Sequence, residues 1–357
     1  MEPETQKRVL LSPLAWGLGH ATRIIPIINE LSQKGYLVTV ATNKELGALI
    51  ANHCPNSDII DFYSPKMKLR MGKVSVFNLL SFLVKLPFVT IIEHKKVKML
   101  LKGKQFTLII SDNRYGFRLP DTKSVIITHQ LRVIPPKPFG FLKLPGKKII
   151  KYLLSKFDEV WVPDFNGSVR IAGILSESNG LNNLKYIGLL SRFYNSTAPP
   201  SSDFYWDITA IASGPEPQKS EFIKLVTACL LGNGQRCLIL KGDPLERNQE
   251  ETIGNITLIG ILDEEEMYQA IKNSRLVISR SGYSTIMDLL CLNKRAILIP
   301  TPGQTEQEYL AQRMNDLGWF KTVNQTELSK EFLLALLDRT IPAPPRFNLK
   351  QVLDFIE

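Results

Sequence analysis

The chain of 357 residues has 44 Lys and Arg against 34 Asp and Glu, and 44% of its residues are hydrophobic. This length exceeds one ordinary hydrophobic core, so we expect two domains, and the composition excludes a disordered or fibrous protein. The four cysteines lack the spacing of a zinc site or a disulfide framework, which indicates a reducing compartment. Because no apolar run reaches about 20 residues and the N-terminus has no apolar signal core, we expect a protein that is neither secreted nor membrane-spanning.

The first half of the chain alternates short apolar runs with amphipathic segments. Residues 7–41 read as strand, glycine turn, helix and strand, and further β-rich runs are expected at residues 57–62, 106–111, 124–128 and 159–163. This alternation predicts a parallel α/β sheet with right-handed crossovers.

The second half repeats this organisation after a polar, proline-containing stretch at residues 195–203. New strands are expected at residues 208–212, 236–240, 255–259, 275–279 and 295–300. The fold class predicted is therefore α/β, with two tandem Rossmann-like domains and an interdomain cleft. The expected divisions are an N-terminal domain (1–192), a linker (193–205), a C-terminal domain (206–345) and a C-terminal helix (346–357) that packs back on the first domain.

Three loops follow predicted strands, at the place where ligands bind in such sheets: residues 16–23, 213–218 and 279–285. A lone Gly-x-Gly is weak evidence, because tight turns use glycine for backbone reasons alone. The third loop opens a helix that Ser281, Ser284 or Thr285 can cap. Backbone N–H groups around Gly282 would then hold a diphosphate, with Arg280 nearby.

Two further positions in the second half have both a functional and a structural interpretation. Asp288 falls one turn into the predicted helix, where it can hold ribose hydroxyls or simply complement the helix dipole. Thr305 and Glu308 have capping-box spacing, which makes Glu308 structural, whereas Gln307 stays available for sugar hydroxyls.

These motifs occur in a familiar order. The run from Arg280 to Asp288, followed by Ile299-Pro300 and then Glu306-Gln-Glu308, resembles the donor half of MurG-type glycosyltransferases, which have the GT-B fold. The segments Gly17-Leu-Gly-His20 and Gly188-Leu-Leu-Ser-Arg192 are similar to that family's N-terminal glycine-rich loop and its end-of-domain segment, so that the resemblance spans most of the chain.

The resemblance implies a role for each matching residue. The donor side comprises Arg192, Ser213, Gly214, Leu262, Arg280, Ser281, Gly282, Ser284, Thr285, Asp288, Gln307 and Glu308, and the acceptor side comprises Gly17, Gly19, His20 and His129. Within the donor set, Arg192 would add charge at the diphosphate, Asp288 would hold the ribose, and Leu262 and Gln307 would meet the uracil and the hexose. Two departures concern the loops: the first lacks one family glycine, and Ser213-Gly-Pro-Glu-Pro217 replaces a glycine-serine phosphate loop.

The sequence predicts no metal site. Holding a catalytic Mg²⁺ or Mn²⁺ requires converging carboxylates, often an Asp-x-Asp pair, and no such pair occurs. The densest acidic run, residues 263–266, fits the first turn of a helix instead. No cofactor is expected beyond the UDP-sugar donor, and the charge of the leaving group would be met by helix N-termini and arginine.

His20 is the first candidate for the catalytic base, because a histidine just past the glycine turn can take a proton from an acceptor hydroxyl. The alternative is a helix-start residue that only makes hydrogen bonds. His129, after the strand at 124–128, is a weaker candidate. The Asp112-Asn113-Arg114 segment offers a second possible base, an acceptor clamp or a satisfied loop turn.

The positive charge is concentrated in the first half. Residues 1–190 carry 27 Lys and Arg against 13 acids, and residues 66–104 alone carry ten against the single Glu93. The apolar helix expected at 74–86 and a second lysine-rich cluster at 137–151 suit an anionic lipid surface. The alternatives are a solvated rim and nucleic acid; the absence of any stacking platform argues against the latter.

Together these patterns and the resemblance predict a glycosyltransferase that moves an N-acetylhexosamine from a UDP-sugar to a lipid-linked or glycan acceptor. The resemblance implies that the reaction is a metal-independent, inverting displacement. It is expected in the cytoplasm, peripherally bound to the inner face of the membrane, with no nucleic acid partner. A UDP-sugar epimerase of the same fold and a non-catalytic partner subunit that binds sugar nucleotide remain as alternatives.

Overall fold

A computed structural model describes residues 7–15, 18–63, 76–135, 137–167, 169–196, 205–243, 249–337 and 343–347. The chain forms two compact units, one of Met1–Leu190 with Leu349–Glu357 and one of Ser191–Asn348. Most of the helix predicted at 346–357 and of the linker predicted at 193–205 lies outside the described residues. Residues 343–347 are described and are not helical.

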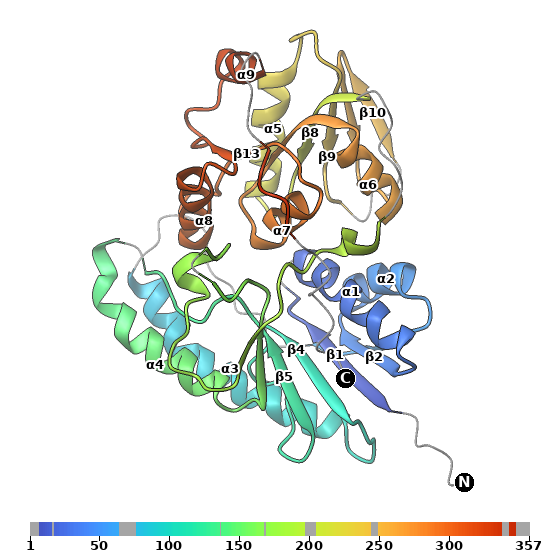
Figure 1. The fold of residues 1–357 in the computed structure, drawn as a ribbon, viewed down its shortest axis with the longest axis vertical. Helices are drawn as coiled ribbons and strands as arrows, with labels where there is room; N and C mark the ends of the chain where they lie inside the picture. The colour runs from blue at the N-terminus through green and yellow to red at the C-terminus, as the bar shows by residue number, and fades with distance from the viewer. Residues whose placement is uncertain are drawn as a thin grey trace. The chain divides into compact units, whose positions relative to one another are not determined.

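The first unit alternates strands and helices in the order that the sequence predicts (Figure 1). Its elements are β1 (Arg8–Pro13), α1 (Leu18–Gln33), β2 (Leu37–Thr42), α2 (Lys44–His53), β3 (Asp58–Asp61), α3 (Val76–Leu100), β4 (Leu108–Asp112), β5 (Lys123–Ile127), η1 (Lys137–Leu142), α4 (Lys143–Leu154), β6 (Glu159–Val162), η2 (Gly173–Leu175) and β7 (Leu184–Tyr186).

The strands of the first unit form one parallel sheet in the order β3-β2-β1-β4-β5-β6-β7. The central strands are nearly continuous apolar runs because helices cover both of their faces. The chain order reverses between β1 and β4, and this reversal creates a topological switch point at their carboxyl ends.

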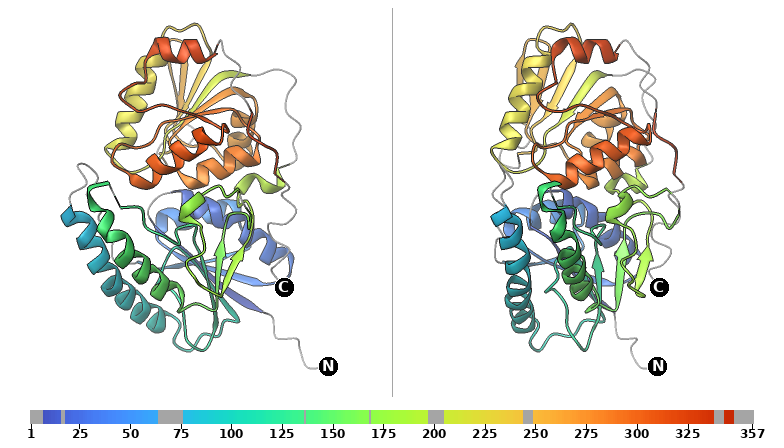
Figure 2. Two further views of the ribbon diagram at one scale, coloured as in Figure 1. Left: turned by 60° about the vertical axis from the view of Figure 1, so that its left-hand side comes forward. Right: turned by 90° about the vertical axis from the view of Figure 1, so that its left-hand side faces the viewer.

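Helices α3 and α4 lie side by side on one face of this sheet, opposite α1 and α2 (Figures 1 and 2). Val97 of α3 and Leu101, just after the helix, pack with Leu10 and Ile109, and α4 residues Ile150 and Leu154 pack with Ile126. The register pairs Leu10 with Ile109 and Ile109 with Ser124, two residues before Ile126, so these strand residues share a face.

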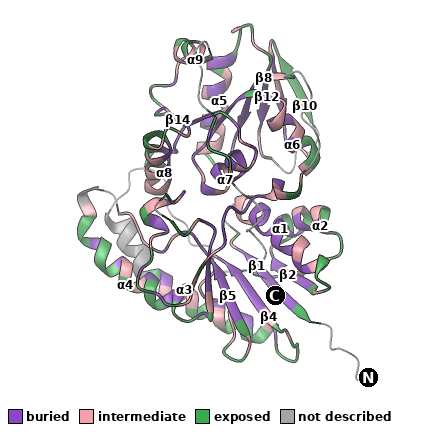
Figure 3. Cartoon of the chain, in the orientation of Figure 1, coloured by how far each residue is buried: buried purple, intermediate pink, exposed green. Residues whose placement is uncertain are grey.

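Helix α3 is longer than the sequence predicts. The helix expected at 74–86 begins at Val76 and continues through Pro87 to Leu100. Proline interrupts a hydrogen bond within a helix but does not have to end it. Along residues 85–100 of α3 and along α4, many residues are exposed, whereas the strands beneath them are buried (Figure 3).

The second unit has the same kind of architecture. Its elements are η3 (Arg192–Asn195), β8 (Trp206–Ile211), α5 (Gln218–Leu230), β9 (Cys237–Leu240), β10 (Glu250–Ile253), β11 (Ile256–Ile259), α6 (Glu264–Lys272), β12 (Ser274–Ser279), α7 (Tyr283–Cys291), β13 (Ala296–Leu298), α8 (Thr305–Asp316), β14 (Lys321–Thr322) and α9 (Lys330–Leu337). The sheet order is β10-β11-β9-β8-β12-β13-β14, with only β10 antiparallel to its neighbour.

The predicted α/β class with two Rossmann-like sheets is confirmed. Three strands were not predicted: β7, β10 and β14, with three, four and two residues. None of the three is buried along its length, so none has the apolar run by which strands are recognised. The β10–β11 hairpin did have a local signal, because Gly254-Asn255 joins two β-rich runs and Gly254 adopts a positive φ of 59°.

Candidate functional site

In the first unit the functional residues gather at the switch point between β1 and β4. The register places Pro13, the last residue of β1, opposite Asp112, the last residue of β4. The chain then turns from β1 into α1, whose first turn contains Gly19 and His20. Gly17, the other glycine of the predicted loop, lies outside the described residues. The loops after β1 and β4 are therefore neighbours although 92 residues separate His20 from Asp112.

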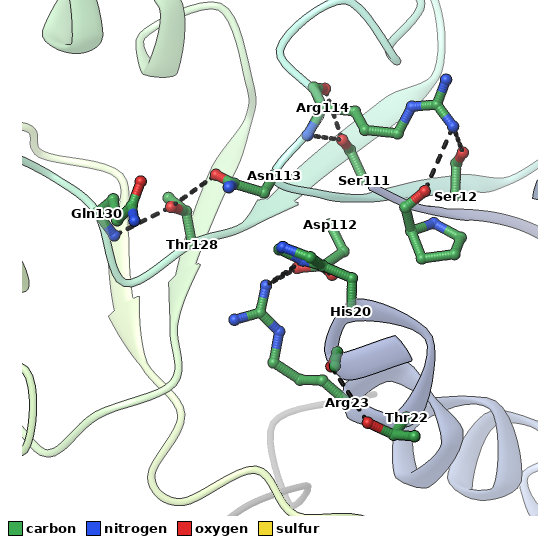
Figure 4. Close-up of polar contacts among 12 residues, drawn as sticks. Ser12, His20, Thr22, Arg23, Ser111, Asp112, Asn113, Arg114, Thr128 and Gln130 are labelled. Atoms are coloured by element: carbon green, nitrogen blue, oxygen red, sulfur yellow. Dashed lines mark hydrogen bonds and ion pairs between the residues drawn. The ribbon is translucent and has the colours of Figure 1, made fainter. Parts of the chain in front are cut away.

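His20 and Asp112, predicted as alternative bases, are hydrogen-bonded partners. His20 Nδ1 lies 2.7 Å from Asp112 Oδ2 (Figure 4). Two unprotonated acceptors would repel at this distance, so Nδ1 carries the hydrogen and donates it to the carboxylate. Nε2 is then the nitrogen with the lone pair. The His20 side chain is 22% exposed and that of Asp112 is 1% exposed. The arrangement is thus an accessible imidazole oriented by a buried carboxylate.

The Asp112 carboxylate is also paired with Arg23 of α1, through Oδ1 (Figure 4). Burial alone would raise the pKa of Asp112, but the charges and hydrogen bonds of Arg23 and His20 lower it below its usual value. Asp112 is therefore ionised in the folded protein at neutral pH and does not itself exchange protons there.

Asn113 and Arg114, the other members of the predicted acceptor clamp, make internal contacts. Asn113 has a positive φ of 57°, and its Oδ1 accepts a hydrogen bond from Thr128 Oγ1 at 3.1 Å. Gln130 N in turn donates to Thr128 Oγ1 (Figure 4). His129, between them in sequence, is 5% exposed just beyond β5. These contacts shape the loop beside the His20–Asp112 pair.

Arg114 is a core residue, so the geometry favours the satisfied-turn interpretation for it. Its Nε donates to Glu93 Oε1 of α3 at 2.8 Å, and Nη1 donates to Ser12 Oγ and Pro13 O. Its guanidinium lies 4.5 Å from the centroid of the Phe62 ring. Glu93, the one acid in the basic segment 66–104, is therefore committed to an internal ion pair. An acceptor cannot be clamped by a guanidinium that is enclosed in this way.

The second unit has the equivalent switch point between β8 and β12, where Ile211 pairs with Ser279. The loop after β8 contains Ser213, which is partly exposed, and Gly214, which is exposed. Gly214 adopts a φ of 103°, a backbone conformation that residues other than glycine rarely adopt. Glu216 in this loop accepts from Ser220 N and lies 3.6 Å from Lys219 Nζ, so its charge is drawn toward α5.

The loop after β12 differs from the prediction in its cap. The N-cap of α7 is Gly282, and neither Ser281, Ser284 nor Thr285 caps the helix. Ser281 is buried, and its hydroxyl donates to Gln307 O at 2.8 Å, which ties this loop to α8. Gly282, Ser284 and Thr285 are partly exposed at the helix start. The predicted side-chain cap is wrong because Ser281 points into the unit.

Arg280 is fully buried. Its guanidinium donates to the carbonyls of Gln218, Ile299 and Pro300 and lies 4.6 Å from the Phe222 ring centroid. Burial lowers the pKa of Arg280 to about 10, and Glu221 opposes this shift. Arg280 therefore braces three loop segments of the second unit, and its contacts do not support the predicted role at a diphosphate.

Asp288 of α7, the predicted ribose ligand, is 9% exposed, and its carboxylate contacts Ser191 and Arg192. Ser191 Oγ donates to Oδ1 at 2.6 Å, and Arg192 Nε lies 3.4 Å from Oδ2. Burial raises the pKa of Asp288, and Arg192 and Ser191 partly offset this. The structure thus brings Arg192 and Asp288 together, two residues that the resemblance places at one donor.

The predicted residues on α8 are partly structural. Gln307 Oε1 accepts from Thr301 N at 2.9 Å, which fixes the β13–α8 loop. The predicted Thr305–Glu308 capping box is wrong, because the helix begins at Thr305 with Gln304 as its N-cap. Glu308 Oε1 accepts from Gly303 N instead, at 2.8 Å. Leu262 is half-buried between β11 and α6, whose capping box is the one formed by Asp263 and Glu266.

Glu264, at the first position of α6, is a site residue that the sequence analysis did not single out. Its pKa is raised to about 7: burial is the largest cause, Arg192 opposes it, and Asp288 and the acids beside Glu264 add to it. Its proximity to Arg192 and Asp288 depends on packing of η3 between α6 and α7, for which the sequence contains no local signal.

Replacing Glu264 with Gln should raise Tm at pH 8 and leave it unchanged at pH 4. The unfolded chain loses this proton near pH 4.5 and the folded protein near pH 7, so the free energy of unfolding falls as pH rises between these values. An uncharged amide removes that dependence. Calorimetry at both pH values checks this result, with Glu265→Gln, on the exposed side of the same turn, as the control. A Tm gain that is equal at both pH values would contradict it.

Within the described residues the protein has neither a cluster of metal-binding side chains nor a helix that could span a membrane. No cluster of three His, Cys, Asp or Glu side chains has the geometry to hold a metal ion. No helix in those ranges has both the length and the apolar character needed to cross a membrane.

Comparison with known proteins adds to this geometry. Residues 244–351 match the C-terminal domain of glycosyltransferase family 28. A relative from Prochlorococcus marinus (strain NATL1A), named a UDP-N-acetylglucosamine–N-acetylmuramyl-(pentapeptide) pyrophosphoryl-undecaprenol N-acetylglucosamine transferase, is 32% identical over 32% of this chain and 34% of its own length. The match therefore spans about a third of that relative. An uncharacterized glycosyltransferase of Methanosarcina acetivorans is 23% identical over 85% of this chain and 82% of its own length.

Solved structures agree in fold along nearly the whole chain. MurG of Acinetobacter baumannii superposes with a TM-score of 0.55 at 13% identity, covering 97% of this chain and 92% of that one. The calicheamicin glycosyltransferase CalG4 gives a TM-score of 0.63 at 11% identity, over 94% and 91% of the two chains. The predicted GT-B fold and the resemblance to MurG-type glycosyltransferases are confirmed. The individual roles of the site residues stay predictions.

Proposed function

We propose that the protein is a glycosyltransferase that moves a sugar, an N-acetylhexosamine, from a UDP-sugar to a hydroxyl group of a lipid-linked or glycan acceptor. The family 28 domain and the names of the bacterial relatives support this class of donor. The observation that carries the proposal is the 2.7 Å contact between His20 Nδ1 and Asp112 at the first switch point. A non-catalytic partner subunit would not need a base oriented in this way.

The proposed reaction is a direct displacement. The acceptor oxygen attacks the anomeric carbon of the donor sugar, its proton passes to His20 Nε2, and the carbon–oxygen bond to the diphosphate breaks with its electron pair on the leaving UDP. Asp112 stabilises the imidazolium that forms. Because the nucleophile and the leaving group are on opposite faces of the carbon, the configuration inverts.

The second unit holds the donor in this proposal. Two helix N-termini, that of α7 at Gly282 and that of α5 after Gly214, present backbone N–H groups to the diphosphate. Arg192 supplies a positive charge. Asp288 then exchanges part of its bonding to Ser191 for the ribose hydroxyls. The backbone N–H groups and Arg192 stabilise the negative charge of the leaving UDP, so the mechanism requires no metal.

Two experiments test this function. In a thermal-shift panel of nucleotide sugars, UDP-N-acetylhexosamines should stabilise the protein, by about 2.7 kcal/mol at a concentration of 100 Kd. Incubation of the stabilising UDP-sugar, labelled in its sugar, with polyprenyl-diphosphate-linked sugars as acceptors should yield labelled lipid at the same rate with and without EDTA. No stabilisation by any UDP-sugar would overturn the proposal, epimer formation without acceptor would favour the epimerase, and loss of activity in EDTA would refute the metal-free mechanism.

We also propose that the protein works at an anionic membrane surface, peripherally on its cytoplasmic face. The support is a patch that we call the α3–α4 surface, on the outer side of these helices. Its exposed apolar residues are Phe88, Ile91, Ile92, Met99, Phe141, Leu144 and Tyr152. Exposed lysines on the same two helices include Lys95, Lys98, Lys148 and Lys151. Exposed apolar side chains together with cations suit insertion between anionic headgroups, where each cation is worth about 1 kcal/mol.

The protein should float with vesicles of phosphatidylglycerol and phosphatidylcholine but not with phosphatidylcholine alone. Changing Lys95, Lys98, Lys148 and Lys151 to Gln should release it, because these four side chains are exposed on the α3–α4 surface. The matched control changes four exposed cations of the second unit, Lys224, Arg275, Arg295 and Lys321, and so alters net charge equally. Equal loss of binding in both variants would show that net charge, not this surface, attracts the protein.

A further inference from the structure

Arg23 is a buried cation beside the proposed base to which no sequence motif assigns a role. It lies one turn after His20 in α1 and is 2% exposed. Its Nη2 donates to Asp112 Oδ1 and lies 3.1 Å from His20 Nδ1 (Figure 4). Asp112 is therefore bonded on both oxygens, with His20 on one and Arg23 on the other.

The short contact of His20 with Asp112 decides which bond Arg23 makes. Since Nδ1 carries the hydrogen that it donates to Oδ2 at 2.7 Å, it has no lone pair to accept another. The Arg23 Nη2 hydrogen consequently goes to Asp112 Oδ1. The guanidinium thus acts on the imidazole only through the carboxylate that both of them contact.

A carboxylate alone would be an imperfect partner for a general base. A negative charge next to an imidazole favours the imidazolium, which cannot accept a proton from the acceptor hydroxyl. With Arg23 present, the cluster of Arg23, Asp112 and neutral His20 has no net charge. Asp112 keeps its orienting hydrogen bond while the positive charge of Arg23 offsets its pull on a second proton.

Among charged side chains, Arg23 and His20 have the largest effects on the pKa of Asp112, and both lower it. Arg114, two residues after Asp112, donates its guanidinium hydrogen bonds to Glu93, Ser12 Oγ and Pro13 O. The balance at Asp112 therefore depends on Arg23 and His20.

From this geometry we infer that Arg23 is a positioning residue that holds Asp112 ionised and oriented, so that His20 keeps its hydrogen on Nδ1 and presents an unprotonated Nε2 at neutral pH. The inference rests on the proposed function for its catalytic consequence. Its structural part, the protonation state of His20, does not require a substrate or an acceptor.

The test is the ring ¹⁵N spectrum of the full-length protein labelled in its four histidines, recorded from pH 5 to 9 without substrate. A His20→Asn variant assigns the His20 signals. In the parent protein His20 should give the pattern of a neutral ring protonated on Nδ1 at pH 7. In Arg23→Met the imidazolium pattern should persist to a pH higher by about 1 to 3 units, the effect of one nearby charge.

Two variants separate positioning from mere packing. Arg23→Lys keeps the positive charge, so the His20 signals of this variant should titrate like those of the parent. This variant also provides a test if Arg23→Met does not fold. Thr22→Val, a buried neighbour whose hydroxyl bonds only to Gly19 O of its own helix, should change neither the tautomer nor the titration. If Arg23→Met titrates like the parent, or if Arg23→Lys shifts His20 by the same amount as Arg23→Met, the inference is overturned.

Activity supplies the second readout. If the protein transfers sugar, Arg23→Met should lose most of its kcat/KM at pH 6 and recover toward the parent at pH 9, with the KM for the UDP-sugar unchanged. A loss of equal factor at every pH would indicate a packing role only and refute the inference. A protein that shows the expected ¹⁵N titration but transfers no sugar would contradict the proposed function and leave the role of Arg23 standing.

Discussion

His20→Ala should lower kcat by about two to four orders of magnitude, the usual contribution of a positioned general base. Nε2 is the only atom of the His20–Asp112 pair placed to receive the acceptor proton, since Nδ1 is bonded to the carboxylate. UDP affinity should be unchanged because the proposed donor residues all belong to the second unit. Single-turnover transfer from a labelled UDP-sugar measures the first quantity, and titration calorimetry with UDP measures the second.

Asp112→Asn provides the companion variant. An amide can donate to Nδ1 and so favours the wrong tautomer, which leaves the hydrogen on Nε2. Because the two residues act as one unit, the double variant should be no slower than the slower single variant. His53→Ala, at the end of α2, is the control histidine. If His20→Ala keeps more than a tenth of the parent kcat, His20 is not the base.

Glu93→Ala should lower the free energy of unfolding by about 3–5 kcal/mol, the cost of leaving one member of a buried ion pair without its partner. Glu93 is 4% exposed; its Oε1 accepts from Arg114 Nε at 2.8 Å and its Oε2 accepts from Gly116 N at 3.0 Å. Arg114 stays charged at neutral pH, and Phe62 and Phe117 enclose its guanidinium, so water cannot readily replace the carboxylate. Urea unfolding followed by tryptophan fluorescence measures the change.

Two matched variants test the cause of that loss. Glu93→Gln keeps a similar shape and one acceptor oxygen, which can serve either the Arg114 or the Gly116 donor, so it should be less destabilised than Glu93→Ala. The double variant Glu93→Met with Arg114→Met removes both charges and should recover part of the stability, as apolar replacements of buried pairs often do. A Glu93→Ala protein within about 1 kcal/mol of the parent would mean that the pair contributes little to folding.

The sequence predicted the fold well because the central strands of both sheets are buried on two faces. Runs such as Val9–Leu11 and Leu276–Ile278 are apolar throughout, and their alternation with helices leaves few topologies. What could not be seen is the extent of elements whose stability comes from packing. Helix α3 continues through Pro87 because Leu86 and Val97 pack against the sheet on either side of it.

The sequence analysis named residues of the candidate site but did not predict which of them contact one another. His20 and Asp112 appeared as competing bases because a sequence does not say which loops meet, although the usual 3-2-1-4 order of such sheets would have made the loops after β1 and β4 neighbours. Arg114 and Arg280 look like anion ligands in a loop, but both guanidiniums are buried against aromatic rings, and both donate to backbone carbonyls or to a buried acid. Only the tertiary fold supplies those partners.

The Glu93–Arg114 pair also links helix α3 to the loop that follows Asp112. Glu93 follows Ile91 and Ile92 of the α3–α4 surface directly in α3, and Arg114 follows Asp112 by two residues. A Cβ at Gly116 would lie 2.4 Å from Thr90 O, so the helix and the loop are in close contact and cannot slide past one another. If α3 adsorbs to a bilayer as proposed, a displacement of the helix is passed to the loop that follows Asp112. By thermodynamic reciprocity, any effect of adsorption on acceptor binding would be matched by an equal effect of the acceptor on adsorption.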